Sequence, residues 1–266
     1  MANHIPGPLY YEQQGESGIL MLFLHSTPDD HRLWMFQTAY FSAWYRTIAV
    51  DLAGYGRSPA PQQGVKIIDQ ADACWEVVDR ITSGGIIIQG NSMGSMIARI
   101  MAAQRPERTL ALIISGCAYQ PERSQMKEWG ERFRREGLKL RHEQILYHFA
   151  PARRGDPLMR WYADMLCALD NLGTLESIIA MNEALQTTHP AEFGEGIVSP
   201  ALLISGSADR NHPNAPELAR RIKGCEYKVI EGAGHSSNFE APWEFNRYCT
   251  DFLKKHGLFP AEARAS

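Results

Sequence analysis

The chain has 266 residues, of which 44% are hydrophobic and 21% are charged, and its formal net charge at pH 7 is -3. This composition is typical of a soluble globular protein with a sizeable core. The charge balance gives no basic surface of the kind that phosphate backbones require, so nucleic acid is not an expected partner. No apolar run reaches the roughly 18 residues that cross a bilayer, so no membrane association is expected either.

The five cysteines are odd in number, widely separated and never in a C-x-x-C pair. This spacing argues against both a disulfide framework and a zinc site, so the sequence predicts no metal and no cofactor. The N-terminal residues have neither the basic segment nor the apolar segment of a secretory signal. We therefore expect a protein of the reducing cytoplasm. A monomer and a homodimer are both compatible with the sequence.

Short runs of β-branched and apolar residues, each closed by a turn signal, have the continuous hydrophobicity of parallel strands that are covered on both faces. They are Ile19–His25, Thr47–Leu52, Gly85–Gly90, Leu110–Gly116, Ala201–Gly206 and Tyr227–Glu231. Helix-length segments lie between several of these runs, namely Asp69–Ile81, Met93–Gln104, Ala215–Ile222 and Pro242–Lys255. The alternation predicts crossover connections, and hence an α/β fold with a mostly parallel, doubly wound sheet.

Residues 119–196 interrupt this alternation, since they contain amphipathic segments and no convincing strand. The amphipathic segments are Gln125–Glu136, Asp156–Leu169 and Leu175–Leu185. We therefore predict a helical cap at 119–196, inserted into one core domain that is formed by residues 1–118 and 197–258. Residues 259–266 are expected to be a flexible tail.

Ser92 is the strongest candidate for a nucleophile. It lies in a G-x-S-x-G pattern with Gly90 and Gly94, directly after a predicted strand and directly before a predicted helix. In this context the serine stands on a sharp turn above the sheet, and a larger residue at either glycine would collide with neighbouring backbone. The start of the following helix also favours negative charge that develops beside the serine.

A serine nucleophile needs a base, which is usually a histidine oriented by a carboxylate. His235 follows the last predicted strand in a Gly-rich loop, whereas histidines such as His148 lie in the cap or in loops without such a context. Asp209 stands just past the strand Ala201–Gly206, at the edge where sites of open parallel sheets assemble. A turn or helix cap is the alternative role for Asp209, and Glu122 is its nearest rival as the acid.

The order Ser92, Asp209, His235 along the chain resembles that of the α/β-hydrolase superfamily. The stretch His25-Ser-Thr-Pro28, which is followed by Trp34, is similar to the His-Gly-x-Pro…Trp loop of that family. The resemblance covers nearly the whole chain. It implies the α/β-hydrolase fold and the chemistry of a serine hydrolase.

Two further features follow from the resemblance. The stretch Asp51–Ser58 is similar to the family's Asp-x-x-Gly-x-Gly-x-Ser turn, where Asp51 is expected to brace loops. By position in the family, the backbone N–H groups of Thr27 and Met93 would form the oxyanion hole. Ser26 replaces the usual glycine of the first loop, which allows a hydroxyl group beside that hole.

The implied reaction is acyl transfer, in which a small carboxylic ester or lactone is cleaved through an acyl-enzyme on Ser92. A serine at this position argues against haloalkane dehalogenase and epoxide hydrolase activity, since the related enzymes use aspartate. The elbow is also similar to that of meta-cleavage-product hydrolases, which cleave carbon–carbon bonds in vinylogous diketones. Those enzymes usually have a Trp directly after the histidine, where this chain has Ser236. We therefore favour ester or lactone hydrolysis and keep carbon–carbon hydrolysis as the alternative.

Two other classes are less favoured. A non-catalytic receptor for a small ligand on the same fold need not keep a full triad, whereas this chain has the three residues. A nucleotide-binding domain would need the G-x-G-x-x-G spacing or a P-loop lysine, which the elbow lacks. The expected partner is therefore a small-molecule ester, lactone or diketone.

The cap is expected to determine specificity because it would cover Ser92. Its first half, residues 119–160, has ten Lys/Arg against six Asp/Glu. Arg153 or Arg154 could hold a substrate carboxylate, although a solvated helix face is the favoured explanation of these charges. The predicted substrate-binding residues come from the cap and from the loops around the triad: Ser26, Trp34, Trp129, Phe133, Arg153, Arg154, Trp161 and Ser236.

Overall fold

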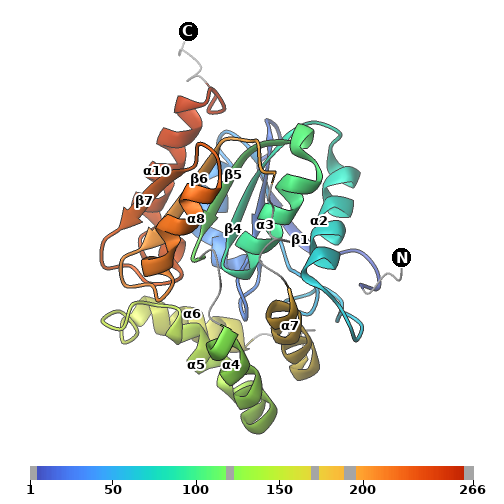
Figure 1. Cartoon of the computed structure of the whole chain (residues 1–266), viewed down its shortest axis with the longest axis vertical. Helices are drawn as coiled ribbons and strands as arrows, with labels where there is room; N and C mark the ends of the chain where they lie inside the picture. Colours follow the sequence, from blue (N-terminus) through green and yellow to red (C-terminus); the bar gives the residue numbers. More distant parts are fainter. Residues whose placement is uncertain (1–4, 118–122, 169–173, 189–195, 261–266) are drawn as a thin grey trace.

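The computed structural model describes residues 5–117, 123–168, 174–188 and 196–260. Within these residues the centre is a seven-stranded sheet in the order β1-β3-β2-β4-β5-β6-β7 (Figure 1). The strand β1 pairs antiparallel with β3, and every other pair is parallel. The strands are β1 (Tyr11–Gln14), β2 (Leu20–Leu24), β3 (Arg46–Val50), β4 (Ile86–Asn91), β5 (Thr109–Ser115), β6 (Ala201–Gly206) and β7 (Glu226–Ile230). This arrangement brings the carboxyl ends of β4, β6 and β7 to one edge of the sheet.

Helices cover both faces of the sheet because the strand side chains alternate between two hydrophobic clusters. Leu20 and Leu22 pack on the side of α2, α3 and α8, whereas Met21 and Phe23 pack on the side of α1, α9 and α10. These helices are α1 (Met35–Phe41), α2 (Ile67–Ile81), α3 (Met93–Gln104), α8 (Ala215–Arg221), α9 (Ser237–Glu240) and α10 (Pro242–Lys255). The burial of both faces explains why the central strands are apolar throughout.

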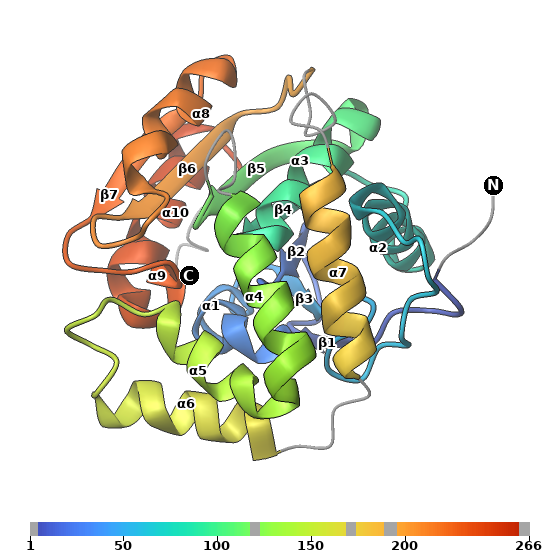
Figure 2. The same cartoon turned by 60° about the horizontal axis from the view of Figure 1, so that its bottom comes forward.

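The helices between β5 and β6 lie beyond the sheet edge where the parallel strands end (Figure 1). They are α4 (Arg123–Glu136), α5 (Leu140–Tyr147), α6 (Pro157–Ala168) and α7 (Leu175–Thr187), and we call them the insert helices. Figure 2 shows α4 and α7 packed side by side in front of the strand ends, with α5 and α6 next to them. Short 3-10 turns complete the described elements: η1 (His31–Trp34), η2 (Pro106–Arg108), η3 (Gly137–Lys139) and η5 (His212–Asn214).

The predicted α/β fold with a mostly parallel sheet is confirmed, and each predicted strand lies within two residues of its expected bounds. The strand β1 was not predicted, because its four residues are exposed at the sheet edge and show no apolar pattern. The helices α1, α5 and α9 were also not predicted. Among the described helices, none combines the length and the apolarity needed to cross a membrane.

The prediction of a flexible tail from residue 259 is wrong for its first residue. The ring of Phe259 packs 5.0 Å from that of Trp44, and its backbone N–H donates to the carbonyl of Leu253 at 3.2 Å. The aromatic contact buries surface that a mobile tail would leave in water. Residues 261–266 lie outside the described part of the chain.

Candidate active site

Ser92 stands at the turn between β4 and α3 with φ of 54° and ψ of -114°. Among the described residues it is the only non-glycine with a positive φ. The turn is crowded: a Cβ on Gly90 would lie 2.3 Å from the carbonyl oxygen of Gly94, and a Cβ on Gly94 would lie 2.1 Å from that of Leu24. The two glycines are therefore sterically required. A strained serine at a strand–helix turn is the arrangement that exposes a hydroxyl nucleophile.

His235 and Asp209 form a buried pair at the ends of β7 and β6. Nδ1 of His235 lies 3.0 Å from Oδ1 of Asp209, and that oxygen also accepts the backbone N–H of Asn211 at 3.0 Å. Burial acts to raise the pKa of Asp209, but the charge and hydrogen bond of His235 hold it below its ordinary value. An ionised Asp209 accepts hydrogen bonds only, so it favours a proton on Nδ1 and leaves Nε2 of His235 as the basic nitrogen.

Ser92 and His235 do not share a hydrogen bond in this structure. The Nε2 atom of His235 is buried and has no hydrogen-bond partner. Ser92 lines a pocket of about 40 Å³, whereas His235 and Asp209 line a neighbouring cavity of about 300 Å³. Catalytic hydrogen bonds are often long before substrate binds, so the absence of this bond does not argue against a role for either side chain.

Thr27 and Met93 line the same pocket as Ser92. Met93 is the first residue of α3, whose initial N–H groups have no acceptor within the helix. The loop after β2 packs directly on this helix start, since the carbonyl oxygens of Leu24 and His25 lie 2.1 and 2.7 Å from the position of a Cβ on Gly94. The geometry is therefore compatible with the predicted oxyanion donors.

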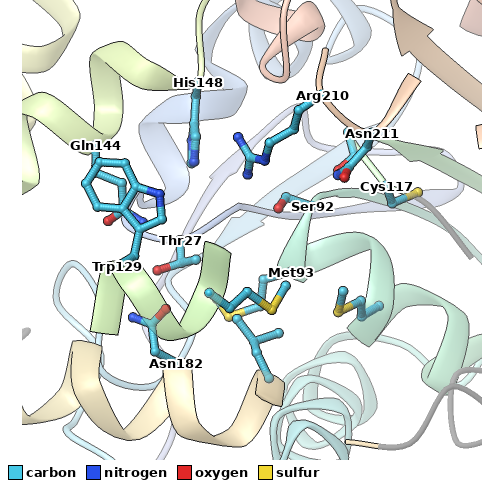
Figure 3. A pocket seen from close by; sticks show the side chains of 14 residues that line it. Thr27, Ser92, Met93, Cys117, Trp129, Gln144, His148, Asn182, Arg210 and Asn211 are labelled. Carbon is cyan, nitrogen blue, oxygen red and sulfur yellow. The ribbon is translucent and has the colours of Figure 1, made fainter. Parts of the chain in front are cut away.

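The walls of the Ser92 pocket come from the insert helices and from the loop after β6. Trp129 of α4 lines it, as predicted (Figure 3). Most of the polar lining was not predicted, although Arg210 and Asn211 directly follow Asp209 and could have been found from that adjacency. The unpredicted polar lining residues are Gln144, His148, Asn182, Arg210 and Asn211.

Two predicted substrate-binding aromatic residues lie in the core instead. Trp34 has no exposed surface, and its ring packs 5.2 Å from that of Phe23 and 6.1 Å from that of Phe245. Phe133 of α4 is equally buried, in the cluster on the α2 and α3 side of the sheet. The prediction that these two residues contact substrate is wrong, because both side chains are buried in the hydrophobic core.

The cap arginines are engaged in contacts of their own and, among the described residues, do not line the Ser92 pocket. Arg153 donates to Asp156 at 2.6 Å and to the carbonyl of Glu240 at 3.3 Å. Arg154 donates to the carbonyls of Phe149 and Tyr147, both at 3.1 Å. Arg154 lines the neighbouring cavity, and neither arginine is among the described residues that line the Ser92 pocket. The cation that does line this pocket is Arg210.

The other predicted contacts are placed elsewhere as well. Trp161 lies on α6 with 49% of its surface exposed, and the described lining of the pocket does not include it. Ser236 is buried, and its N–H donates to the carbonyl of His148 at 3.2 Å. The hydroxyl of Ser26 donates to the carboxylate of Asp29 rather than facing the oxyanion hole. Glu122, the rival acid, lies outside the described residues.

Asp51 braces loops, as expected. One carboxylate oxygen accepts the N–H of His31 at 2.8 Å and the other accepts the N–H of Arg57 at 2.8 Å. Asp30, His31 and Asp51 form a cluster of three side chains of the kind that bind metals. The carboxylate oxygens of Asp51 already accept the two N–H groups, and the carboxylate of Asp30 pairs with Arg32. The donor set therefore works as a structural brace.

A family model for the alpha/beta hydrolase fold matches residues 19–242. The chain therefore belongs to the α/β-hydrolase family. This agrees with the sheet order, with the elbow at Ser92 and with the positions of Asp209 and His235 at the ends of later strands.

Named relatives show the range of hydrolases to which the chain is similar. The (E)-2-((N-methylformamido)methylene)succinate hydrolase of Acinetobacter baylyi is 26% identical over 92% of this chain and 94% of that protein. The 2-hydroxy-6-oxononadienedioate/2-hydroxy-6-oxononatrienedioate hydrolase of Cupriavidus pinatubonensis is 27% identical over 80% of this chain and 77% of its own. The structure of Est816, an N-acyl homoserine lactone degrading enzyme, matches with a TM-score of 0.75 and 25% identity over 94% of this chain and 99% of that one.

Proposed function

We propose that the protein is a serine hydrolase that cleaves a small carboxylic ester or lactone on the triad Ser92, His235 and Asp209. The observation that carries this proposal is the strained turn at Ser92, at the same sheet edge as a histidine whose Nδ1 lies 3.0 Å from a buried carboxylate. Strain at a functional group persists only where the surrounding structure holds it. Here two glycines with no room for a Cβ hold it.

The first half of the reaction forms an acyl-enzyme. The Oγ atom of Ser92 attacks the carbonyl carbon of the substrate while Nε2 of His235 takes the hydroxyl proton. The N–H groups of Thr27 and Met93 stabilise the oxyanion, and losing one such donor typically lowers the rate by about 10²–10³. His235 then gives the proton to the leaving alkoxide. In a lactone the leaving oxygen stays attached to the acyl group.

The second half releases the acid. A water molecule gives a proton to Nε2 of His235 and attacks the acyl carbon. The second tetrahedral intermediate then expels Oγ of Ser92, which takes that proton back from His235, and the acid is released. Asp209 keeps the imidazole in one orientation through both halves and stabilises its charged form. No step needs a group beyond these residues, the substrate and water.

The insert helices are proposed to be a cap over the nucleophile, with 119–196 as the inserted segment and residues 1–118 and 197–258 as the core. Residues from α4, α5 and α7 line the Ser92 pocket, which supports this division. Apolar contact there comes from Met126, Trp129 and Leu185. A pocket with apolar walls and a few polar groups is typical of sites for small molecules.

Hydrolysis of p-nitrophenyl acetate and butyrate tests the proposal. The wild-type protein is expected to turn over at least one of these esters or an N-acyl homoserine lactone, a probe suggested by the similarity to Est816. Ser92→Ala should reduce kcat to the background rate, whereas Ser83→Ala, at an exposed position, is the control and should leave kcat unchanged. Unchanged turnover in Ser92→Ala would refute the assignment.

Carbon–carbon hydrolysis is the second candidate. It is favoured by the similarity to the hydrolase named for 2-hydroxy-6-oxononadienedioate. Its substrate would be a vinylogous diketone, a coloured ring-fission product, and its hydrolysis is followed as loss of absorbance. Bleaching of such a compound by a sample that leaves all esters and lactones intact would replace the first candidate by the second.

A further inference from the structure

A second pair of histidine and aspartate adjoins the Ser92 pocket, and the proposed triad does not use it. His148 follows α5, is buried, and its ring centroid lies 4.8 Å from that of His235. Its Nδ1 atom lies 3.7 Å from Oδ2 of Asp29. Its backbone carbonyl accepts the N–H of His235 at 2.8 Å. Two imidazoles with an aspartate behind each therefore stand side by side.

Asp29 is held firmly in place. Its side chain is 1% exposed, and its two oxygens accept the hydroxyl groups of Ser26 and Tyr162, the latter at 3.0 Å. Burial acts to raise the pKa of Asp29, but the contacts with His148 and Ser26 keep it below its ordinary value. A buried carboxylate in this state needs donors from every side. Ser26 supplies one of them, which gives a reason for a serine where the related loop has glycine.

The aspartate determines which nitrogen of His148 carries the proton. Nδ1 of His148 lies 3.7 Å from the carboxylate, which is longer than a hydrogen bond, and has no hydrogen-bond partner among the described residues. The negative charge of Asp29 therefore acts on this nitrogen through space and favours the proton there. Burial lowers the pKa of His148 to about 4, and the charges of His235 and Arg210 act in the same direction. The ring is therefore neutral near pH 7, and Nε2 carries a lone pair that can accept a hydrogen bond.

The ring is placed where a substrate would meet it. Figure 3 shows the ring of His148 and the guanidinium group of Arg210 pointing into the pocket that Ser92 and Thr27 also line. The same two residues line the neighbouring cavity that reaches His235 and Asp209. His148 thus borders both the Ser92 pocket and the cavity next to it.

We propose that His148, positioned by Asp29 and Ser26, is a specificity-determining residue whose Nε2 accepts a hydrogen bond from a hydroxyl or N–H group of the substrate. The inference rests on the proposed function and adds to it a substrate class. The preferred ester or lactone carries a hydrogen-bond donor on its acyl side, close to the scissile carbonyl. An otherwise equal apolar substrate leaves a buried acceptor unpaired and reacts more slowly.

Matched pairs of esters test this inference. The probes are the p-nitrophenyl esters of butyrate, 2-hydroxybutyrate and 3-hydroxybutyrate, together with those of N-acetylglycine and N-acetyl-β-alanine. The wild-type kcat/KM is expected to be highest for a donor-bearing ester. In His148→Phe, which keeps a ring against His235, this preference over butyrate should fall about tenfold. His142→Phe is the control, because His142 lies exposed on α5 and pairs with Asp164 at 2.9 Å.

Asp29→Asn separates positioning from packing. An asparagine amide can donate to Nδ1, so the proton of His148 moves to Nε2 and the acceptor becomes a donor. The preference should then pass from the hydroxybutyrates to the ester of acetoacetate, whose ketone accepts a hydrogen bond. Nitrogen-15 spectra of labelled histidine should show the proton on Nδ1 of His148 in the wild type and on Nε2 in Asp29→Asn. Ser26→Gly should weaken the preference without reversing it.

The outcomes distinguish this inference from the proposed function. If a fluorophosphonate fails to label the wild-type protein and every ester is inert, the proposed function itself fails. If esters are hydrolysed but the wild type prefers butyrate to all donor-bearing probes, the role of His148 is refuted. A loss of the same size for every ester in both His148→Phe and Asp29→Asn would show that the pair is only structural, and would also refute it.

Discussion

Glu240 joins the loop of the candidate base to the segment after α5, and its substitution makes a quantitative prediction. The side chain is 5% exposed and accepts the N–H groups of Gly234 at 2.8 Å and of Ala150 at 3.1 Å. Burial raises the pKa of this carboxyl group from its ordinary value of 4.5 to about 7, in spite of those two hydrogen bonds. The folded protein therefore holds a proton here that the unfolded chain has lost.

The sign and the size of the effect follow from linkage. Between pH 4.5 and about 7 the folded state binds more protons at Glu240 than the unfolded state does, so its free energy of unfolding falls as pH rises through this window. Each unit of pKa corresponds to about 1.4 kcal/mol, so the full loss is roughly 3 kcal/mol above pH 7. Glu240→Gln removes the ionisation but keeps an oxygen for the N–H of Gly234.

Urea unfolding of the wild type and of Glu240→Gln, followed by tryptophan fluorescence at pH 5, 6, 7 and 8, measures the effect. The variant should gain roughly 3 kcal/mol relative to the wild type between pH 5 and pH 8, because all other groups titrate in both proteins. Glu107→Gln, at an exposed position, is the matched control. A difference between wild type and Glu240→Gln that stays constant with pH, or that changes in the opposite direction, would refute the reasoning.

Three further predictions concern the elbow, the acid and the cysteines. Gly94→Ala should abolish ester hydrolysis, since its Cβ would lie 2.1 Å from the carbonyl oxygen of Leu24, and loss of the tertiary circular dichroism signal would show whether the fold is lost with it. Asp209→Asn should keep the fold, with an unchanged melting curve, but should lower kcat by about 10³–10⁴, because the amide favours the wrong tautomer of His235. A decrease in kcat of less than tenfold would contradict the role of Asp209 as the acid of the triad. Under mild labelling with iodoacetamide, mass spectrometry should find Cys167 modified first, because it is exposed, and Cys74 and Cys249 last, because both are fully buried and burial raises the pKa of each thiol well above its ordinary value.

The sequence predicted well those helices and strands whose pattern of apolar residues matches the faces that are buried in the fold. The buried strands could be predicted because both faces are covered, so that runs such as Ile86–Asn91 are apolar throughout. The edge strand β1 could not, because its four residues are exposed and are held in the sheet by backbone pairing with β3. The elbow at Ser92 was found because strand, turn and helix follow one another along the chain.

The pocket walls could be predicted only in part, because they depend on contacts between distant segments. Trp34 was expected at the site because it follows the His25–Pro28 loop, and Phe133 because it lies in the predicted cap, but both side chains pack in the core. His148 was passed over because nothing in its local sequence shows that its ring packs against that of His235 or that Asp29 lies near its other side. The sequence shows which residues can react, whereas the tertiary fold decides which residues surround them.

Labelling with a fluorophosphonate probe tests the central claim most directly. We predict one covalent adduct, located at Ser92 by peptide mass spectrometry, with a labelling rate that falls by at least about 10²-fold in His235→Ala. His142→Ala, which changes an exposed histidine, should be labelled as fast as the wild type. An adduct at any residue other than Ser92, or equal labelling rates in the wild type and His235→Ala, would contradict the assignment of the triad.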